Sequence, residues 1–144
     1  MEYRRFGDTL LVRLDPGEEL LAALTAVASR EGVAFGSVQG IGAVCELEVG
    51  LFDPERKVFH SRCFTGYREL TAADGTITQR NGKPYLHLHA SAADAQGAVV
   101  GGHLVRAVVS ATAELVIRTA PAAVDRRFDP AIGLNLLAFG AEDA

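Results

Sequence analysis

The 144-residue chain is poor in the residues that mark several protein classes. It has no tryptophan, one methionine and two cysteines, Cys45 and Cys63, which lie far apart and in no CxxC spacing. The two cysteines could pair, but a chain with a sizeable core and no export signal more often keeps its thiols reduced. We expect the two thiols to be unpaired and buried or half-buried.

Long apolar runs are also missing. Apolar residues make up 49% of the chain, but charge or glycine interrupts them well before the ~18 residues that a membrane span needs. The first residues, Met1-Glu2-Tyr3-Arg4-Arg5, lack the apolar centre of a signal peptide. We therefore expect a bacterial or archaeal protein of the cytoplasm, without a membrane partner.

A basic excess is absent as well. The formal net charge is −4, so the chain as a whole does not attract phosphate backbones, and DNA binding would need a local basic patch. The pairs Arg4-Arg5 and Arg126-Arg127 are interpreted as solvated surface charge.

One segment has clear helical periodicity. Asp15 is predicted as the N-cap, Pro16 as the first helical residue and Gly32 as the stop. Between them, apolar residues recur at helical spacing, which predicts a helix that packs on a sheet: Leu20, Leu21, Leu24, Val27 and Ala28.

Nearly all the remaining segments read as strands joined by tight turns. This pattern predicts an α+β fold with a mainly antiparallel β-sheet, one principal helix and a single domain over residues 1–144. The predicted strands are 9–14, 35–41, 44–52, 58–64, 68–72, 76–80, 85–91, 98–100, 104–109, 114–118 and 134–139.

Two segments, 104–109 and 111–117, are nearly continuous apolar runs, as in strands buried on both faces. One helix covers only part of one sheet face. The remaining apolar surface, with the small residues Ala107, Ser110 and Ala113, predicts packing between subunits of a homo-oligomer.

Three of the four histidines lie within seventeen residues. His87 and His89 occupy alternate positions of an apolar strand, which puts both side chains on one face, and His103 follows two glycines in a later segment. Three neutral imidazoles suit zinc or another divalent metal and leave a fourth position open to water or substrate. The alternative is that these histidines line a surface and bind nothing.

Four further features need an interpretation. Glu69 is a candidate general base or an acceptor that orients an imidazole; the alternative is an ion pair with Arg68 or Arg106. Arg106 is interpreted as structural rather than as a substrate clamp, and His60 as a surface residue. Gly40-Ile41-Gly42 lacks the third glycine and the helix of a dinucleotide loop, so it is interpreted as a strand break or a bulge.

The chain resembles the plant and prokaryote conserved (PPC) domain over roughly residues 3–139. The most specific part is Lys83-Pro84-Tyr85-Leu86-His87-Leu88-His89-Ala90 followed by Gly101-Gly102-His103-Leu104. Weaker matches are Gly40-Ile41-Gly42-Ala43, Gly50-Leu51-Phe52-Asp53, Tyr67-Arg68-Glu69-Leu70, Gly75-Thr76-Ile77, Glu114-Leu115-Val116-Ile117 and the segment from Arg126 to Asp129.

The resemblance implies a central antiparallel sheet flanked by a helix and assembled as a homotrimer. It also implies a fold similar to that of acetolactate decarboxylase, whose zinc is held by three histidines. Plant members carry AT-hook motifs and bind DNA, and prokaryotic members are labelled DNA-binding by analogy. This chain has no Arg-Gly-Arg-Pro-like AT-hook.

Three hypotheses follow. The first is a homotrimeric PPC-domain protein of unassigned activity with a divalent metal, expected to be zinc, at His87, His89 and His103. In this hypothesis the metal either binds and activates a small oxygenated ligand or only holds the subunits together. The second is a DNA-binding or regulatory protein. The third is an assembly domain without chemistry. The sequence does not decide whether the protein is an enzyme.

Overall fold

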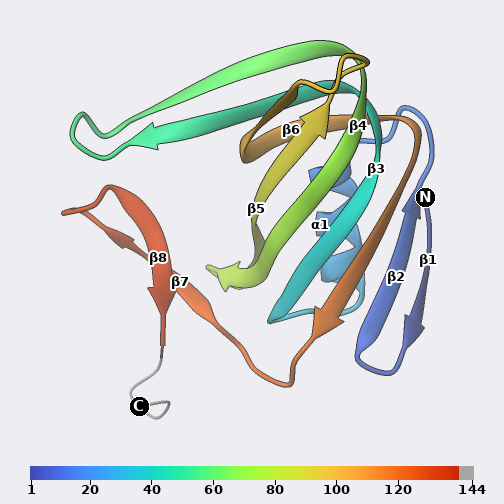
Figure 1. Ribbon diagram of the computed structural model, residues 1–144. Helices are drawn as coiled ribbons and strands as arrows, with labels where there is room; N and C mark the ends of the chain where they lie inside the picture. Colours follow the sequence, from blue (N-terminus) through green and yellow to red (C-terminus); the bar gives the residue numbers. More distant parts are fainter. Residues whose placement is uncertain (140–144) are drawn as a thin grey trace.

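Eight strands and one helix make up residues 1–139, the part of the chain that the computed structural model describes (Figure 1). This confirms a mostly β fold with one helix. The elements are β1 (Glu2–Phe6), β2 (Thr9–Leu14), α1 (Leu20–Arg30), β3 (Gly36–Asp53), β4 (Val58–Arg80), β5 (Lys83–Ala93), β6 (Val99–Thr119), β7 (Asp125–Asp129) and β8 (Leu134–Ala138).

The strands form one sheet in the order β1-β2-β6-β3-β4-β7-β8, and β5 pairs with both β4 and β6. The pairings β3–β4, β4–β5, β5–β6 and β6–β3 are all antiparallel and close a ring of four strands. β6 can pair on two sides because it has 21 residues and begins against β5 before continuing along β3. The ring therefore has a seam where β6 meets both neighbours.

The strands are longer than the sequence predicts. Predicted pairs such as 35–41 and 44–52 are joined into single strands that bend at bulges. One bulge lies between Gly40 and Gly42, where a strand break or a bulge is predicted. A bulge bends a strand without ending it, so the breaks in periodicity mark curvature. β1 and β7 are not predicted, because both are short and rich in charge.

The helix begins later than predicted. Asp15 is not its N-cap; Glu19 is, and its carboxylate accepts hydrogen bonds from the backbone amides of Leu21 and Ala22. The Met1 ammonium binds the carboxylates of Asp15 and Glu18 at 2.9 and 2.8 Å, which ties this segment to the N-terminus. The helix ends at Arg30, and Gly32 follows with φ +62°, in agreement with the predicted stop.

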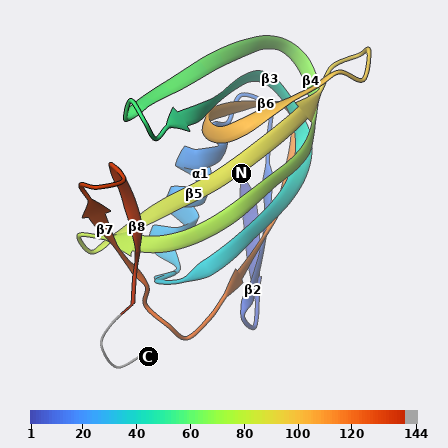
Figure 2. The same ribbon diagram turned by 60° about the vertical axis from the view of Figure 1, so that its left-hand side comes forward.

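The core lies between α1 and one face of the curved sheet (Figures 1 and 2). Along β6 the burial alternates, so the predicted burial on both faces does not occur within one chain. The core side chains of α1 and β6 are Leu20, Leu24, Val27, Ala28, Leu104, Ala107, Val109, Ala113, Leu115 and Ile117.

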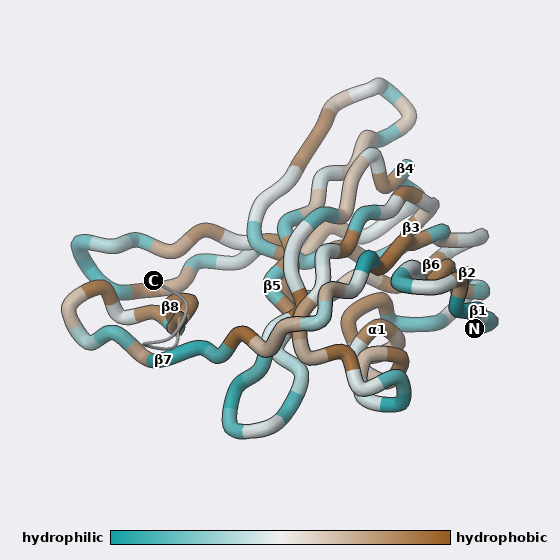
Figure 3. Tube along the Cα trace, turned by 90° about the horizontal axis from the view of Figure 1, so that it is seen from below, coloured by the Kyte–Doolittle hydropathy of each residue, from teal (hydrophilic) through white to brown (hydrophobic). Residues whose placement is uncertain are grey.

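Some apolar residues stay outside this core. Figure 3 shows hydrophobic residues along β8, in a hairpin that extends away from the sheet. Cys45 and Cys63 are unpaired as predicted, but Cys63 is exposed rather than buried. Within residues 1–139, no helix is long and apolar enough to cross a membrane.

A substitution on β5 tests the alternation that positions the histidines. Leu88 lies between His87 and His89, is 1% exposed and points into the core. Leu88→Ala should lower the free energy of unfolding by about 2–5 kcal/mol, because it leaves a cavity. Leu11→Ala on β2, where the side chain is 49% exposed, should cost no more than about 1 kcal/mol.

Urea unfolding followed by circular dichroism, at one fixed protein concentration, measures both variants. Equal losses for Leu88→Ala and Leu11→Ala would contradict the assigned faces of β5.

Candidate metal centre

β5 presents two of the histidines on one face. Successive side chains of a strand point to opposite faces, so His87 and His89 share a face and the buried Leu88 takes the other. His87 is half-buried and His89 is exposed. The predicted orientation of the pair is confirmed.

The third histidine of the cluster lies at the seam of the four-strand ring. His103 of β6 is the direct partner of His89 on β5 and also of Gly50 on β3. An antiparallel partner projects its side chain on the same face, so His103 joins the pair.

The two glycines before His103 allow this close approach. A Cβ at Gly101 would lie 2.7 Å from the Ala90 carbonyl oxygen, and one at Gly102 would lie 2.6 Å from the Gly50 carbonyl oxygen. Real Cβ atoms do not come that close to backbone oxygens, so only glycine fits at the seam without a shift. The Gly-Gly-His sequence thus places the imidazole by letting β6 pass between β5 and β3.

The three imidazoles form a compact cluster. Their ring centroids are 5.3 Å apart for His87–His89, 5.1 Å for His87–His103 and 5.7 Å for His89–His103. One nitrogen from each ring lies within 4.8 Å of the other two. Tetrahedral zinc with Zn–N bonds of about 2.0–2.1 Å needs nitrogens about 3.3 Å apart, which small side-chain rotations can provide. The donor set therefore fits a zinc ion.

Two of the three imidazoles are held neutral. Burial lowers the pKa of His87 from 6.5 to about 4, with further contributions from the charges of Arg126, His103 and His89. Burial also lowers the pKa of His103, and His89 adds to the effect. A neutral imidazole has the free lone pair that a metal needs, so this environment favours the ligand form over the imidazolium.

Other groups border the cluster. The Phe59 ring meets His103 edge-on at 5.6 Å between centroids and limits its rotation. A groove runs past His89 and His103, and its wall includes His60, Arg62 and Gly101. His60 is exposed, as predicted, yet it lies in the wall of this groove.

Glu69 does not lie beside the histidines of its own chain. On β4 it pairs with Ala93 of β5, which is four residues, or about 13 Å, from His89 along the strand. The ion pairs suggested for it go elsewhere: Arg68 pairs with Asp94 at 3.6 Å, and Arg106 with Glu46. The prediction that Arg106 is structural agrees with this contact.

The interpretation of Arg126 as solvated surface charge is wrong. This side chain is half-buried: its guanidinium donates hydrogen bonds to Thr78 and Thr76 of β4, and its Cζ atom lies 4.9 Å from the centre of the Tyr85 ring. Arg127 is exposed, as predicted for both residues. A strand prediction over 125–129 would have separated the two, because neighbouring strand residues face opposite ways.

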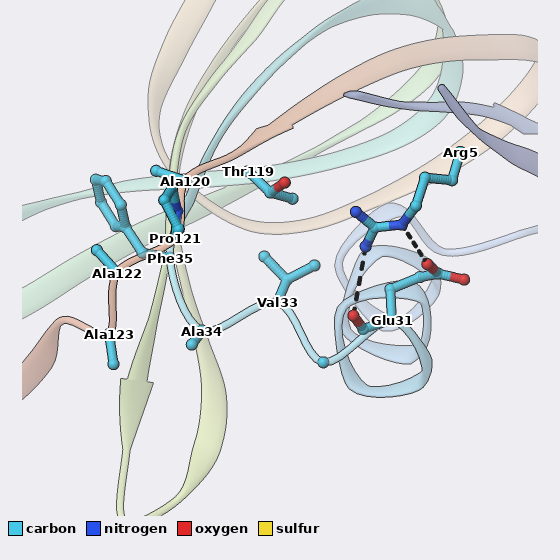
Figure 4. A pocket seen from close by; sticks show the side chains of 11 residues that line it. Arg5, Glu31, Val33, Ala34, Phe35, Thr119, Ala120, Pro121, Ala122 and Ala123 are labelled. Carbon is cyan, nitrogen blue, oxygen red and sulfur yellow. Dashed lines mark hydrogen bonds and ion pairs between the residues drawn. The ribbon is translucent and has the colours of Figure 1, made fainter. Parts of the chain in front are cut away.

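A second hollow lies near the C-terminal end of α1, away from the histidines (Figure 4). The Arg5 Nε atom binds the Glu31 carboxylate at 2.8 Å across one side of it, so these two charges satisfy each other. Its other walls are mostly small and apolar: Val33, Ala34, Phe35, Thr119, Ala120, Pro121, Ala122 and Ala123. This hollow offers no comparable set of metal ligands.

Solved structures share the whole fold. A candidate DNA-binding protein from Bacteroides thetaiotaomicron is 30% identical, with 96% of each chain covered and a TM-score of 0.93. A metal-containing protein from Archaeoglobus fulgidus is 29% identical, with 96% of this chain and 97% of that chain covered and a TM-score of 0.85.

More distant structures share the fold alone. The α-acetolactate decarboxylase from Bacillus subtilis is 15% identical, with a TM-score of 0.58 over 85% of this chain and 57% of that chain. The predicted likeness to this fold is therefore confirmed. No curated protein gave a match.

The family follows from the sequence match. Residues 1–121 match the Plants and Prokaryotes Conserved (PCC) domain, and this match contains all three clustered histidines and the seam between β5 and β6. The chain belongs to the Plants and Prokaryotes Conserved domain family.

Proposed function

We propose that His87, His89 and His103 bind one divalent metal ion, with zinc as the expected metal, and that this centre binds a small molecule. The observation that carries the proposal is the convergence of three imidazole nitrogens within 4.8 Å on one sheet face. The lowered pKa of His87 and His103 supports it, because both residues are then neutral near pH 7. A similar structure is that of a metal-containing protein, which agrees with this assignment.

Three protein ligands leave one tetrahedral position for water or a small molecule. Bound there, zinc would supply Lewis acidity and lower the pKa of its water toward ~7. The chain's own residues hold the ligand nitrogens in place, through the strand pairing of His89 with His103 and the Phe59 ring against His103.

We further propose that the chain assembles as a homotrimer. Large apolar side chains stay exposed in the single chain, on the outer sheet face and on the β7–β8 hairpin, and such surface favours association. Examples are Tyr67 (83%), Leu51 (72%), Phe139 (70%), Ile41 (58%) and Phe128 (54%). Glu69, which also lies away from the histidines of its own chain, would reach a metal centre only from a neighbouring subunit.

Metal analysis tests the proposed centre directly. Protein purified without a histidine tag should contain about one equivalent of divalent metal per chain by inductively coupled plasma mass spectrometry. His89→Ala and His103→Ala should each lose most of the metal, because two imidazoles bind zinc more weakly than three. His60→Ala is the matched control, since His60 is an exposed histidine outside the cluster, and it should keep its metal.

A wild-type protein that holds only traces of metal after incubation with zinc, with no difference from His89→Ala, would refute the centre. The hypothesis of an assembly domain without chemistry predicts a different result. A triple variant without the three histidines would then keep its assembly and any ligand binding unchanged.

The pKa of His87 gives a pH test on protein treated with a chelator. The unfolded chain binds a proton on His87 near pH 6.5, whereas the folded chain binds it only near pH 4, so stability falls as the pH is lowered through this window. His87→Gln should show a smaller fall in the free energy of unfolding between these two pH values. The carboxyls of Asp15, Glu18 and Glu31, whose pKa values are lowered by their ion pairs, occur in both proteins and cancel.

Parallel urea titrations across that pH range measure the difference. Equal falls in wild type and His87→Gln would show that His87 is not held neutral by the fold.

DNA binding is the second candidate, because a structure 30% identical to this chain is that of a candidate DNA-binding protein. The net charge of −4 opposes it, since phosphate contacts supply most of the affinity for DNA. We expect a gel shift only at low salt and without sequence preference. A shift that persists at physiological salt on one sequence, and is lost with Arg4→Ala and Arg5→Ala, would favour the DNA-binding function instead.

A further inference from the structure

We propose that Arg126 and the three-histidine centre together form a binding site for a small carboxylate, with the guanidinium holding the carboxylate beside the metal. This inference rests on the proposed metal centre and names the class of its ligand.

Arg126 reaches the face of the sheet that carries the histidines. Its Nη2 atom binds the Thr76 hydroxyl at 3.3 Å, and Thr76 is the direct cross-strand partner of His87. Its guanidinium also lies over the ring of Tyr85, which shares the face of His87 two residues along β5. In Figure 2 the β7–β8 hairpin stands beside the end of β5 and β4 that this contact joins.

The Arg126 guanidinium has N–H groups that donate to no residue in the described part of the chain. It has five N–H groups, and three are used, toward the Thr78 hydroxyl, the Thr76 hydroxyl and the Asn135 carbonyl oxygen. All three acceptors are neutral. One N–H on each terminal nitrogen is left for a ligand, and a carboxylate matches two such donors.

The charges around Arg126 favour an anionic ligand. No ion pair joins Arg126 to a carboxylate within residues 1–139, and burial lowers the pKa of its guanidinium. Three neutral imidazoles would leave the full double charge of the metal, to which Arg126 adds one more. Asp74 is opposite His89 on β4, but its side chain is exposed and a single carboxylate leaves the site positive.

Asn135 supplies an independent sign of a polar occupant. Its Oδ1 atom is buried and has no hydrogen-bond partner within the described residues. Its backbone carbonyl oxygen accepts from Arg126, and its Nδ2 atom is 3.5 Å from the Tyr85 hydroxyl, so Asn135 lies beside both residues. A buried acceptor without a partner is unfavourable, and a donor group on a ligand or a water would satisfy it.

Arg126 also anchors the hairpin to β4, so a structural role has to be separated from ligand binding. We would load the protein with cobalt(II), whose absorption spectrum reports its coordination, and titrate it with lactate. Lactamide, which has the same shape without the charge, serves as the neutral probe. Arg126→Gln, Arg126→Lys and Arg127→Gln are the variants, the last being a matched loss of charge at the exposed neighbour.

Wild type should bind lactate and not lactamide. Arg126→Gln should weaken lactate binding at least about tenfold, Arg126→Lys should weaken it less, and Arg127→Gln should leave it within about twofold. Cobalt stoichiometry should stay the same in all variants, because Arg126 is not a metal ligand.

Three other outcomes would contradict the proposal. Lactate binding that is equal in wild type and Arg126→Gln, at full cobalt content, would overturn the role of Arg126 and leave the metal centre standing. Equal losses in Arg126→Gln and Arg126→Lys, with a lower melting temperature for both, would also overturn it, in favour of a hairpin anchor. A wild-type protein that takes up no cobalt would refute the proposed centre itself.

Discussion

The pairing of β6 with two strands at once is the constraint on which the rest of the structure depends. His103 is opposite His89 on one side and Gly50 on the other, and this double pairing closes the four-strand ring. Backbone hydrogen bonds fix the register, and a shift of one residue would turn His103 to the opposite face. The pairing that closes the sheet therefore also brings the three histidines together.

In the metal-free chain, this arrangement brings together groups whose positive charges would repel one another. His87 is half-buried beside two other imidazoles and a guanidinium, and a proton on it would be both desolvated and repelled. The fold avoids this by keeping His87 neutral, at the cost of stability in acid. In the proposed centre, a metal ion that accepts the lone pairs would remove the need to keep these imidazoles unprotonated by burial alone.

The sequence predicts the parts that depend on local spacing. Strand alternation is enough to put His87 and His89 on one face, and Gly40-Ile41-Gly42 does read as a bulge. It cannot predict partners that meet only in the folded chain. Glu19 caps the helix while Asp15 binds the Met1 ammonium, and the half-buried Arg126 donates hydrogen bonds to two threonine hydroxyls of β4. In each case a contact distant in sequence decides a residue's role.

Net charge and local charge give different information about ligands. A charge of −4 over 144 residues disfavours a polyanion such as DNA, which needs basic groups along an extended surface. A small carboxylate responds only to charges within about one Debye length, roughly 8–10 Å. The Arg126 guanidinium is one such charge, because it binds Thr76, the cross-strand partner of His87. A metal ion held by the three histidines would add to it, so an acidic chain that opposes nucleic acid leaves a small anion as a suitable ligand for the proposed centre.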